Sequence, residues 1–259
     1  MPIDKPYHRM YRPMVQGPNS PFSGWAYVLD KSYARSPDHY VRAYLLIQKD
    51  LERLFEYVEP SPEAKTTFSF RIHELLMRTC IEVEANFKAI LDENTFTPAI
   101  DKNTKKPIYN MRVYKRVERS HHLSKYELVL PMWNGERRLW KPFEGWATGN
   151  NIDWYQAYNA SKHDRQQEFK KANLEVLISA VAGLLALISA QFQTQDFTTG
   201  ADNVTYGGYD YHEMQASIGG LFRIAYPTDW TDAEKYDFDW SKLKDEPVRF
   251  QKFNYDTQP

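Results

Sequence analysis

The residues best suited to chemistry lie in the segment YNASKHDR, at positions 158–165. In a helix, Asn159 and Lys162 share one side, and His163 lies four residues after Asn159 on an adjoining side. An imidazole beside an ammonium group resists protonation, because like charge lowers its pKa. A neutral histidine can act as a general base, while lysine and arginine can hold a phosphate. Such a set could cleave RNA, with His163 taking the 2′-hydroxyl proton and the cations stabilising the phosphorane.

The same residues also fit a structural role. In that case Tyr158, Asn159 and Arg165 pin two helices together, and His163 caps a helix or packs in the core. The two hypotheses differ in the surroundings of His163. An exposed His163 near cations favours RNA binding, whereas a buried, hydrogen-bonded His163 favours a non-catalytic scaffold.

A second predicted helix, from about residue 64 or 67 to 91, has one apolar and one polar side. The apolar side includes Cys80, which we interpret as a small buried hydrophobic residue. The polar side is either a solvated face with an Arg78–Glu82 pair or a seam facing the 158–165 segment. In the second case Arg71 and Arg78 bind phosphate. The polar side contains Arg71, Glu74, Arg78, Glu82 and Asn86.

YNASKHDR, followed by a loop and a long apolar helix, resembles the HEPN superfamily of small all-α bundles. RIHELLMRTCIEVEANFK resembles the preceding helix of such a bundle. HEPN proteins are commonly dimers, and many are metal-independent ribonucleases in toxin–antitoxin, abortive-infection and antiviral systems. Their motif is an arginine, a polar residue and, after a short spacer, a histidine. Asn159 matches the polar position and His163 the histidine, while Tyr158 stands at the arginine position.

The resemblance covers residues 65–93 and 150–193. It implies a HEPN-like antiparallel bundle, a homodimer, and RNA binding or RNA cleavage in a prokaryotic defence or toxin-type system. Tyrosine cannot supply the cation that the family's arginine gives to the phosphate. Lys162 and Arg165 are candidates to replace it, and so are Arg71 and Arg78 from the facing helix.

Other motifs point to no further site. Arg116 with His121 or His122 also fits the bare HEPN spacing, but Val117 occupies the polar position, so we interpret this match as coincidental. No spacing of His, Cys and carboxylates suggests a metal site, and no glycine-rich phosphate loop occurs, so we expect no metal and no cofactor. A partner-binding scaffold and a small-molecule binder with a pocket between the bundle and the aromatic segments are the alternative functions.

Composition predicts one cytoplasmic domain over residues 1–259. The 33 lysines and arginines nearly balance the 34 aspartates and glutamates, so a nucleic-acid role needs a local basic patch. The single cysteine fits a reducing compartment, and the N-terminus has no apolar region typical of a signal peptide. The apolar run from Val176 to Ala190 is shorter than a membrane span, so it predicts a buried core helix.

We therefore expect a mainly α fold, with the bundle core formed by residues 36–93 and 150–193. Ser36 and Pro37 start one helix, Asn150 or Asn151 caps another, and Asn173 caps the apolar helix. Residues 94–149 form an insertion with a loop, a short helix and a β-hairpin that turns at Asn134-Gly135. Residues 194–259 form an irregular, aromatic-rich wrap.

Overall fold

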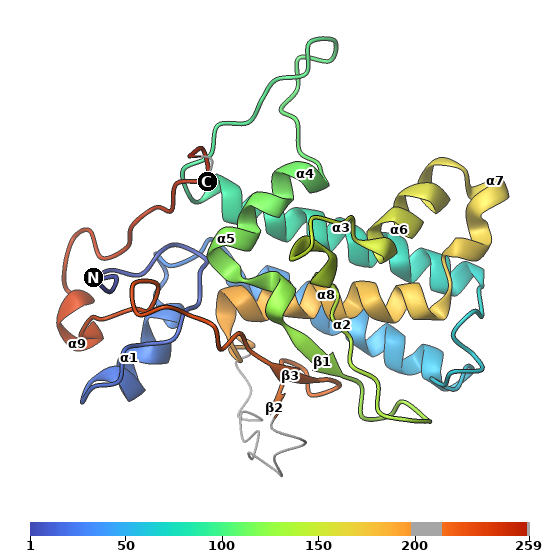
Figure 1. Cartoon of the computed structure of the whole chain (residues 1–259), viewed down its shortest axis with the longest axis horizontal. Coiled ribbons are helices and arrows are strands. Elements are labelled where there is room, and N and C mark those ends of the chain that lie inside the picture. The colour runs from blue at the N-terminus through green and yellow to red at the C-terminus, as the bar shows by residue number, and fades with distance from the viewer. Residues whose placement is uncertain (198–213, 258–259) are drawn as a thin grey trace.

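A computed structural model describes residues 1–197 and 214–257. The described chain is mainly helical, with a small three-stranded antiparallel sheet at one side of the helices. Figure 1 shows the long helices side by side, α6 and α7 at one end of the long axis, and the N-terminus with α1 and α9 at the other. Part of the predicted C-terminal wrap, at 198–213, lies outside the described residues.

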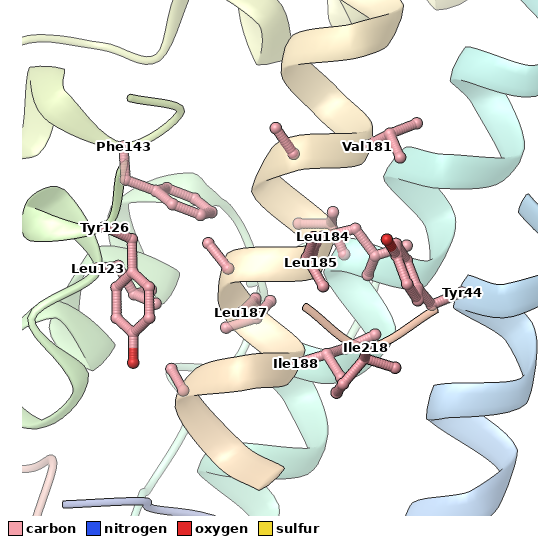
Figure 2. Packing of buried hydrophobic residues seen from close by; sticks show 14 of the residues in the cluster. Tyr44, Leu123, Tyr126, Phe143, Val181, Leu184, Leu185, Leu187, Ile188 and Ile218 are labelled. Atoms are coloured by element: carbon pink, nitrogen blue, oxygen red, sulfur yellow. The ribbon is translucent and has the colours of Figure 1, made fainter. Parts of the chain in front are cut away.

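Helix α8 (Leu174–Phe192) is the centre of the bundle and packs against α2, α3 and α6. Its predicted cap is confirmed, because the Asn173 side chain accepts a hydrogen bond from the Val176 amide at 3.1 Å. Figure 2 shows buried side chains on opposite sides of α8, with Phe143 on one and Tyr44 on the other. Although α8 is long and apolar enough to cross a membrane, the rest of the bundle covers it.

Helices α2 (Pro37–Phe55) and α3 (Phe70–Asp92) form an antiparallel pair against α8. Helix α3 starts later than predicted, because the preceding residues make other backbone contacts. Phe68 forms a β-bridge with Asn173, and the Thr67 carbonyl accepts from the Leu174 amide at 2.9 Å. The Ser69 side chain then caps α3. Cys80 is fully buried on this helix, as predicted, and burial raises the pKa of its thiol.

The polar side of α3 does not face the 158–165 segment, so the predicted seam is wrong. Arg78 pairs with Asp50 of α2 instead of with Glu82, and Arg71 pairs with Glu74 at 2.8 Å. Arg71, Glu74 and Arg78 therefore turn toward α2 and solvent, and Asn86 is buried against α8, because α6 packs next to a different edge of α3.

Helix α6 (Asp153–His163) is followed by a break at Asp164, the short helix α7 (Arg165–Glu168) and a 3₁₀ turn, η5 (Phe169–Lys171). The YNASKHDR segment is therefore not one continuous helix, since α6 ends two residues before Arg165. Asp164 leaves the helical conformation, and its carboxylate caps α7 by accepting from the Gln167 amide at 3.1 Å. The predicted caps Asn150 and Asn151 are also wrong, because Ile152 occupies that position.

The insertion differs most from its prediction. Strand β1 (Glu127–Val129) pairs with β3 (Arg223–Ala225), which also pairs with β2 (Gln215–Ala216). The predicted hairpin is reduced to one bridge between Leu128 and Trp140. Pro131 lacks an amide hydrogen, and the Asn134 amide instead donates to the Pro60 carbonyl at 2.8 Å, which draws this loop to the α2–α3 connection. The short helix is found as α4 (Met111–Tyr114), η2 (Lys115–Val117) and α5 (Glu118–His121), followed by η3 (Leu123–Lys125) and η4 (Glu144–Trp146).

The two terminal segments run together along one end of the bundle. Parallel bridges join Ile3 and Met14 to Tyr236, and Tyr7 to Gln251. Helices α1 (Ser20–Ala26) and α9 (Trp240–Leu243), with the turn η1 (Tyr27–Leu29), fill the space between them. The described part of the C-terminal wrap is therefore confirmed, and its aromatic side chains pack against the N-terminal segment.

His121 fixes the N-terminal segment to α5. Its Nε2 donates to the Arg9 carbonyl at 2.8 Å, since a carbonyl can only accept. The other ring nitrogen then accepts from the Ser120 hydroxyl at 2.8 Å, which requires a neutral ring. Burial lowers the pKa of His121 from 6.5 to about 3, and the nearby Arg12 and His122 act in the same direction.

We expect acid to destabilise the protein through His121. Between the folded pKa of about 3 and the unfolded pKa of 6.5, only the unfolded state binds the proton, so stability falls as pH drops through this window. From pH 7 to pH 5 the loss is about 2 kcal/mol for this one group. Urea unfolding at both pH values should show a smaller loss in His121→Gln. An equal loss in both proteins would contradict this assignment.

Candidate functional site

Helix α6 is anchored by its first half, and its second half carries the candidate residues. The Trp154 indole donates to the Pro142 carbonyl at 2.8 Å and packs against Gly183 of α8. A Cβ at Gly183 would lie 2.9 Å from the Trp154 ring, so glycine at this position permits the close approach of α6 to α8. The anchored half fixes the rotation of α6, which decides what each later residue faces.

Tyr158 faces the core and belongs to a cluster around Glu84 of α3, which we call the Glu84 cluster. The Tyr155 and Tyr158 hydroxyls both donate to one Glu84 carboxylate oxygen, at 3.0 and 3.3 Å. The Lys162 ammonium donates to the Tyr158 hydroxyl at 2.9 Å. Tyr158 is only 1% exposed, so it holds α6 on α3 and does not reach a ligand.

In the Glu84 cluster Lys162 stays charged, and its ammonium group is engaged in a hydrogen bond with Tyr158. The hydrogen bond to Tyr158 raises the pKa of Lys162, and the nearby Glu84 carboxylate adds to this effect. Burial raises the pKa of Tyr158, against the opposing effect of Lys162. The ammonium group is therefore directed at a phenol inside the protein, and the predicted pairing of Lys162 with a phosphate loses its geometric support.

His163 is the last residue of α6 and is exposed. It forms no hydrogen bond with any residue that the structure describes. Asn159 is half-buried one turn earlier, and Arg165 is exposed on α7, beyond the break at Asp164. The structure therefore does not place His163 in the buried capping role, and it separates His163 from Arg165 by a change of helix.

Arg71 and Arg78 lie elsewhere, in a groove of about 360 Å³ between α2 and α3. Both side chains pair with carboxylates there, and the exposed Tyr57 also lines the groove. They are not brought together with Asn159, Lys162 and His163. A second groove, of about 690 Å³, lies between residues 138–154 and α8, beside the inserted β segment.

Sequence reasoning missed an aromatic and basic surface beside α7, which we call the aromatic end. The ring centroid of Phe169 lies 5.8 Å from that of Phe68 and 4.9 Å from that of Phe70. The Arg165 guanidinium lies 6.0 Å from the Phe70 centroid, and the Lys170 ammonium 5.9 Å from that of Phe68. Phe70 is 70% exposed, although it is a large apolar side chain.

Two signals in the sequence could have revealed these features. Phe68 and Phe70 stand immediately before the apolar face of α3, so their rings have no place in that face. Glu84 lies four residues after the buried Cys80, which puts it on the side of α3 that a neighbouring helix must cover.

His121 and His122 form no catalytic set with the other residues that the structure describes. His121 is buried, and His122 stacks on Trp230 with ring centroids 4.0 Å apart while contacting Asp229 and Glu234. Arg116 instead donates to the Tyr255 carbonyl. Within residues 1–197 and 214–257, no group of His, Cys, Asp and Glu is arranged to hold a metal ion.

Comparisons with known proteins returned no match among family models, curated proteins or solved structures. The arrangement of side chains is therefore the basis for a functional proposal.

We expect Tyr158 and His163 to differ sharply in their effect on stability. Tyr158→Phe removes two part-buried hydrogen bonds of the Glu84 cluster and should lower the free energy of unfolding by about 1–3 kcal/mol. His163→Ala changes an exposed side chain and should stay within about 0.5 kcal/mol of the parent. Urea unfolding measures both. If His163→Ala lowered the free energy of unfolding more than Tyr158→Phe, His163 would have a structural role.

Proposed function

We propose that this chain is a HEPN-like RNA-binding protein that contacts single-stranded RNA through the aromatic end. The observation that carries the proposal is the exposed Phe70 ring next to the Arg165 guanidinium. Proteins that bind single strands combine aromatic rings, on which bases stack, with cations that follow the phosphates. Both elements occur here on one small surface.

The charges of the aromatic end support an anionic ligand. Arg165 and Lys170 form no ion pair within the described residues, whereas Lys171 pairs with Glu168. Exposed cations without carboxylate partners attract phosphate without first breaking an internal pair. Phe70 adds a flat apolar face that water solvates poorly and that a base would cover.

The finer proposal is metal-independent RNA cleavage, with His163 as the general base. Its support is the HEPN resemblance and the exposure of His163 at the end of α6. Arg165 is the cation nearest in sequence that is not bound to Tyr158. We also propose that the active form is a homodimer, because HEPN proteins commonly act as dimers and a second copy would bring further cations to His163.

We expect Phe70→Ala to weaken the binding of oligouridine about five- to 150-fold, because one stacked base contributes about 1–3 kcal/mol. Arg165→Gln should also weaken binding and make it less sensitive to salt. Fluorescence anisotropy at two salt concentrations measures both effects. Phe22→Ala is the matched control, since Phe22 is also an exposed phenylalanine. Equal losses in Phe22→Ala and Phe70→Ala, or no binding by the parent, would overturn the proposal.

Cleavage has a separate test. Incubation of purified protein with single-stranded RNA in the presence of a chelator should give products with 2′,3′-cyclic phosphate ends, since the proposed attack comes from the 2′-hydroxyl. His163→Ala should give none while retaining oligouridine affinity. Intact RNA with the parent protein would remove the nuclease proposal and leave RNA binding in place.

A non-catalytic, partner-binding scaffold is the second candidate, and the Glu84 cluster favours it. Tyr158, at the motif's arginine position, donates to Glu84, and Lys162, a candidate substitute for that arginine, donates to Tyr158. This candidate would hold if the parent protein neither bound nor cleaved RNA while Tyr158→Phe remained destabilising.

A further inference from the structure

The strongest local charge in the molecule lies away from the aromatic end. Residues 99–119 contain seven of the 33 lysines and arginines but only two of the 34 acidic residues. This segment therefore carries a formal charge of +5 within a chain whose net charge is −1. Figure 1 shows its first part projecting away from the bundle on the side of α4.

The projecting part, residues 99–108, is an ordered hairpin-like arm, which we call the basic arm. Ile100 and Pro107 form a β-bridge, and the Ile108 amide donates to the Ala99 carbonyl at 2.8 Å. At its tip, the Asp101 carboxylate accepts from the amides of Asn103 and Thr104, at 3.0 and 2.6 Å.

The single acid of the basic arm is thus used to shape the turn. Its bonds to Thr104 lower the pKa of Asp101, and no ion pair within the described residues involves it. Lys102, Lys105 and Lys106 are all exposed around this turn and have no carboxylate partner among the described residues.

Helices α4 and α5 continue the basic surface. Arg112, Lys115, Arg116 and Arg119 line a groove of about 270 Å³ together with Tyr255, Thr257 and Glu118, whose carboxylate accepts hydrogen bonds from Ser124. Arg116 and Arg119 donate to carbonyls of the C-terminal segment, at 3.1 Å to Tyr255 and 2.5 Å to Thr257, so they anchor that segment. Arg112 and Lys115 form no ion pair in the described part of the chain and remain available to a ligand.

Phe96 and Tyr109, the aromatic side chains beside this surface, are half-buried, whereas Phe70 is 70% exposed. Arg116 lies 5.5 Å from the Phe96 centroid, and Lys88 lies 5.8 Å from that of Tyr109. The Tyr109 hydroxyl also bonds Asp92 at 2.7 Å. Since no ring of this surface is as exposed as Phe70, its cations suit a ligand that offers phosphates with its bases turned inward.

We propose that the basic arm, with Arg112 and Lys115, binds the phosphate backbone of double-stranded RNA. The choice of RNA as the polyanion rests on the proposed function, but the surface is distinct from the aromatic end. Recognition depends on charge and shape and not on base sequence, because every available contact is a lysine or arginine. The protein then has two RNA contacts, one for paired and one for unpaired segments.

The test measures binding of a blunt RNA duplex by fluorescence anisotropy over a series of salt concentrations. Replacing Lys102, Lys105 and Lys106 by glutamine should lower the affinity at least about tenfold and reduce the salt slope by about two to three, since each lost phosphate contact contributes about 0.9. Arg112→Gln with Lys115→Gln should give a similar, smaller change. Oligouridine binding should change less than duplex binding in both variants.

Replacement of Lys31, Lys49 and Lys244 by glutamine is the matched control, because these exposed lysines lie elsewhere and the net charge changes equally. An equal loss in this control, or no duplex binding by the parent, would overturn the inference. So would binding to phosphatidylserine vesicles that the arm variant loses while duplex affinity stays unchanged. Duplex binding without oligouridine binding would overturn the proposed aromatic-end contact and leave this inference standing.

Discussion

The buried charge of Arg9 determines how the terminal segments are held on the bundle. Its guanidinium is 0% exposed and bonds Glu93 at 2.6 Å, Gln191 at 2.9 Å and the Arg35 carbonyl at 2.6 Å. A buried charge without such partners would cost several kcal/mol, so the ends of α3 and α8 and the N-terminal segment have one compatible arrangement. Gln191 extends the network by donating to Asn86, which explains why this polar residue lies on the buried side of α3.

This network closes one end of the bundle and leaves the other end to α6 and α7. Around Arg9 the termini, α1 and α9 cover the helices. At the opposite end, the chain breaks at Asp164, and Phe70, His163 and Arg165 face solvent. The side chains at that end are therefore open to solvent, as Phe22 and Trp25 of α1 are at the Arg9 end.

Local sequence patterns predicted the long helices well, because the start and the apolar face of each helix can be recognised within its own segment. Asn173, which caps the apolar run of α8, is an example. Local patterns failed where a distant segment competed for the same backbone. Strand β1 pairs with β3 of the C-terminal segment, and Phe68 pairs with Asn173, so neither partner lies within a local window. The site was predicted in part: exposure of His163 followed one sequence-based alternative, but the partner of Tyr158 depended on how α6 rotates against α3.

The rotation of α6 explains why tyrosine is suited to position 158. The side chain there points at Glu84 and is almost fully buried, so a cation would be held by that carboxylate and would not reach a phosphate. One turn later, the Lys162 ammonium is also held inside this cluster, because it donates a hydrogen bond to the Tyr158 hydroxyl. The first cation free of the Glu84 cluster is Arg165, which lies beyond a helix break from His163. A catalytic pair needs fixed geometry, whereas a binding surface tolerates such a break, so the arrangement supports RNA binding more strongly than cleavage by one copy of the chain.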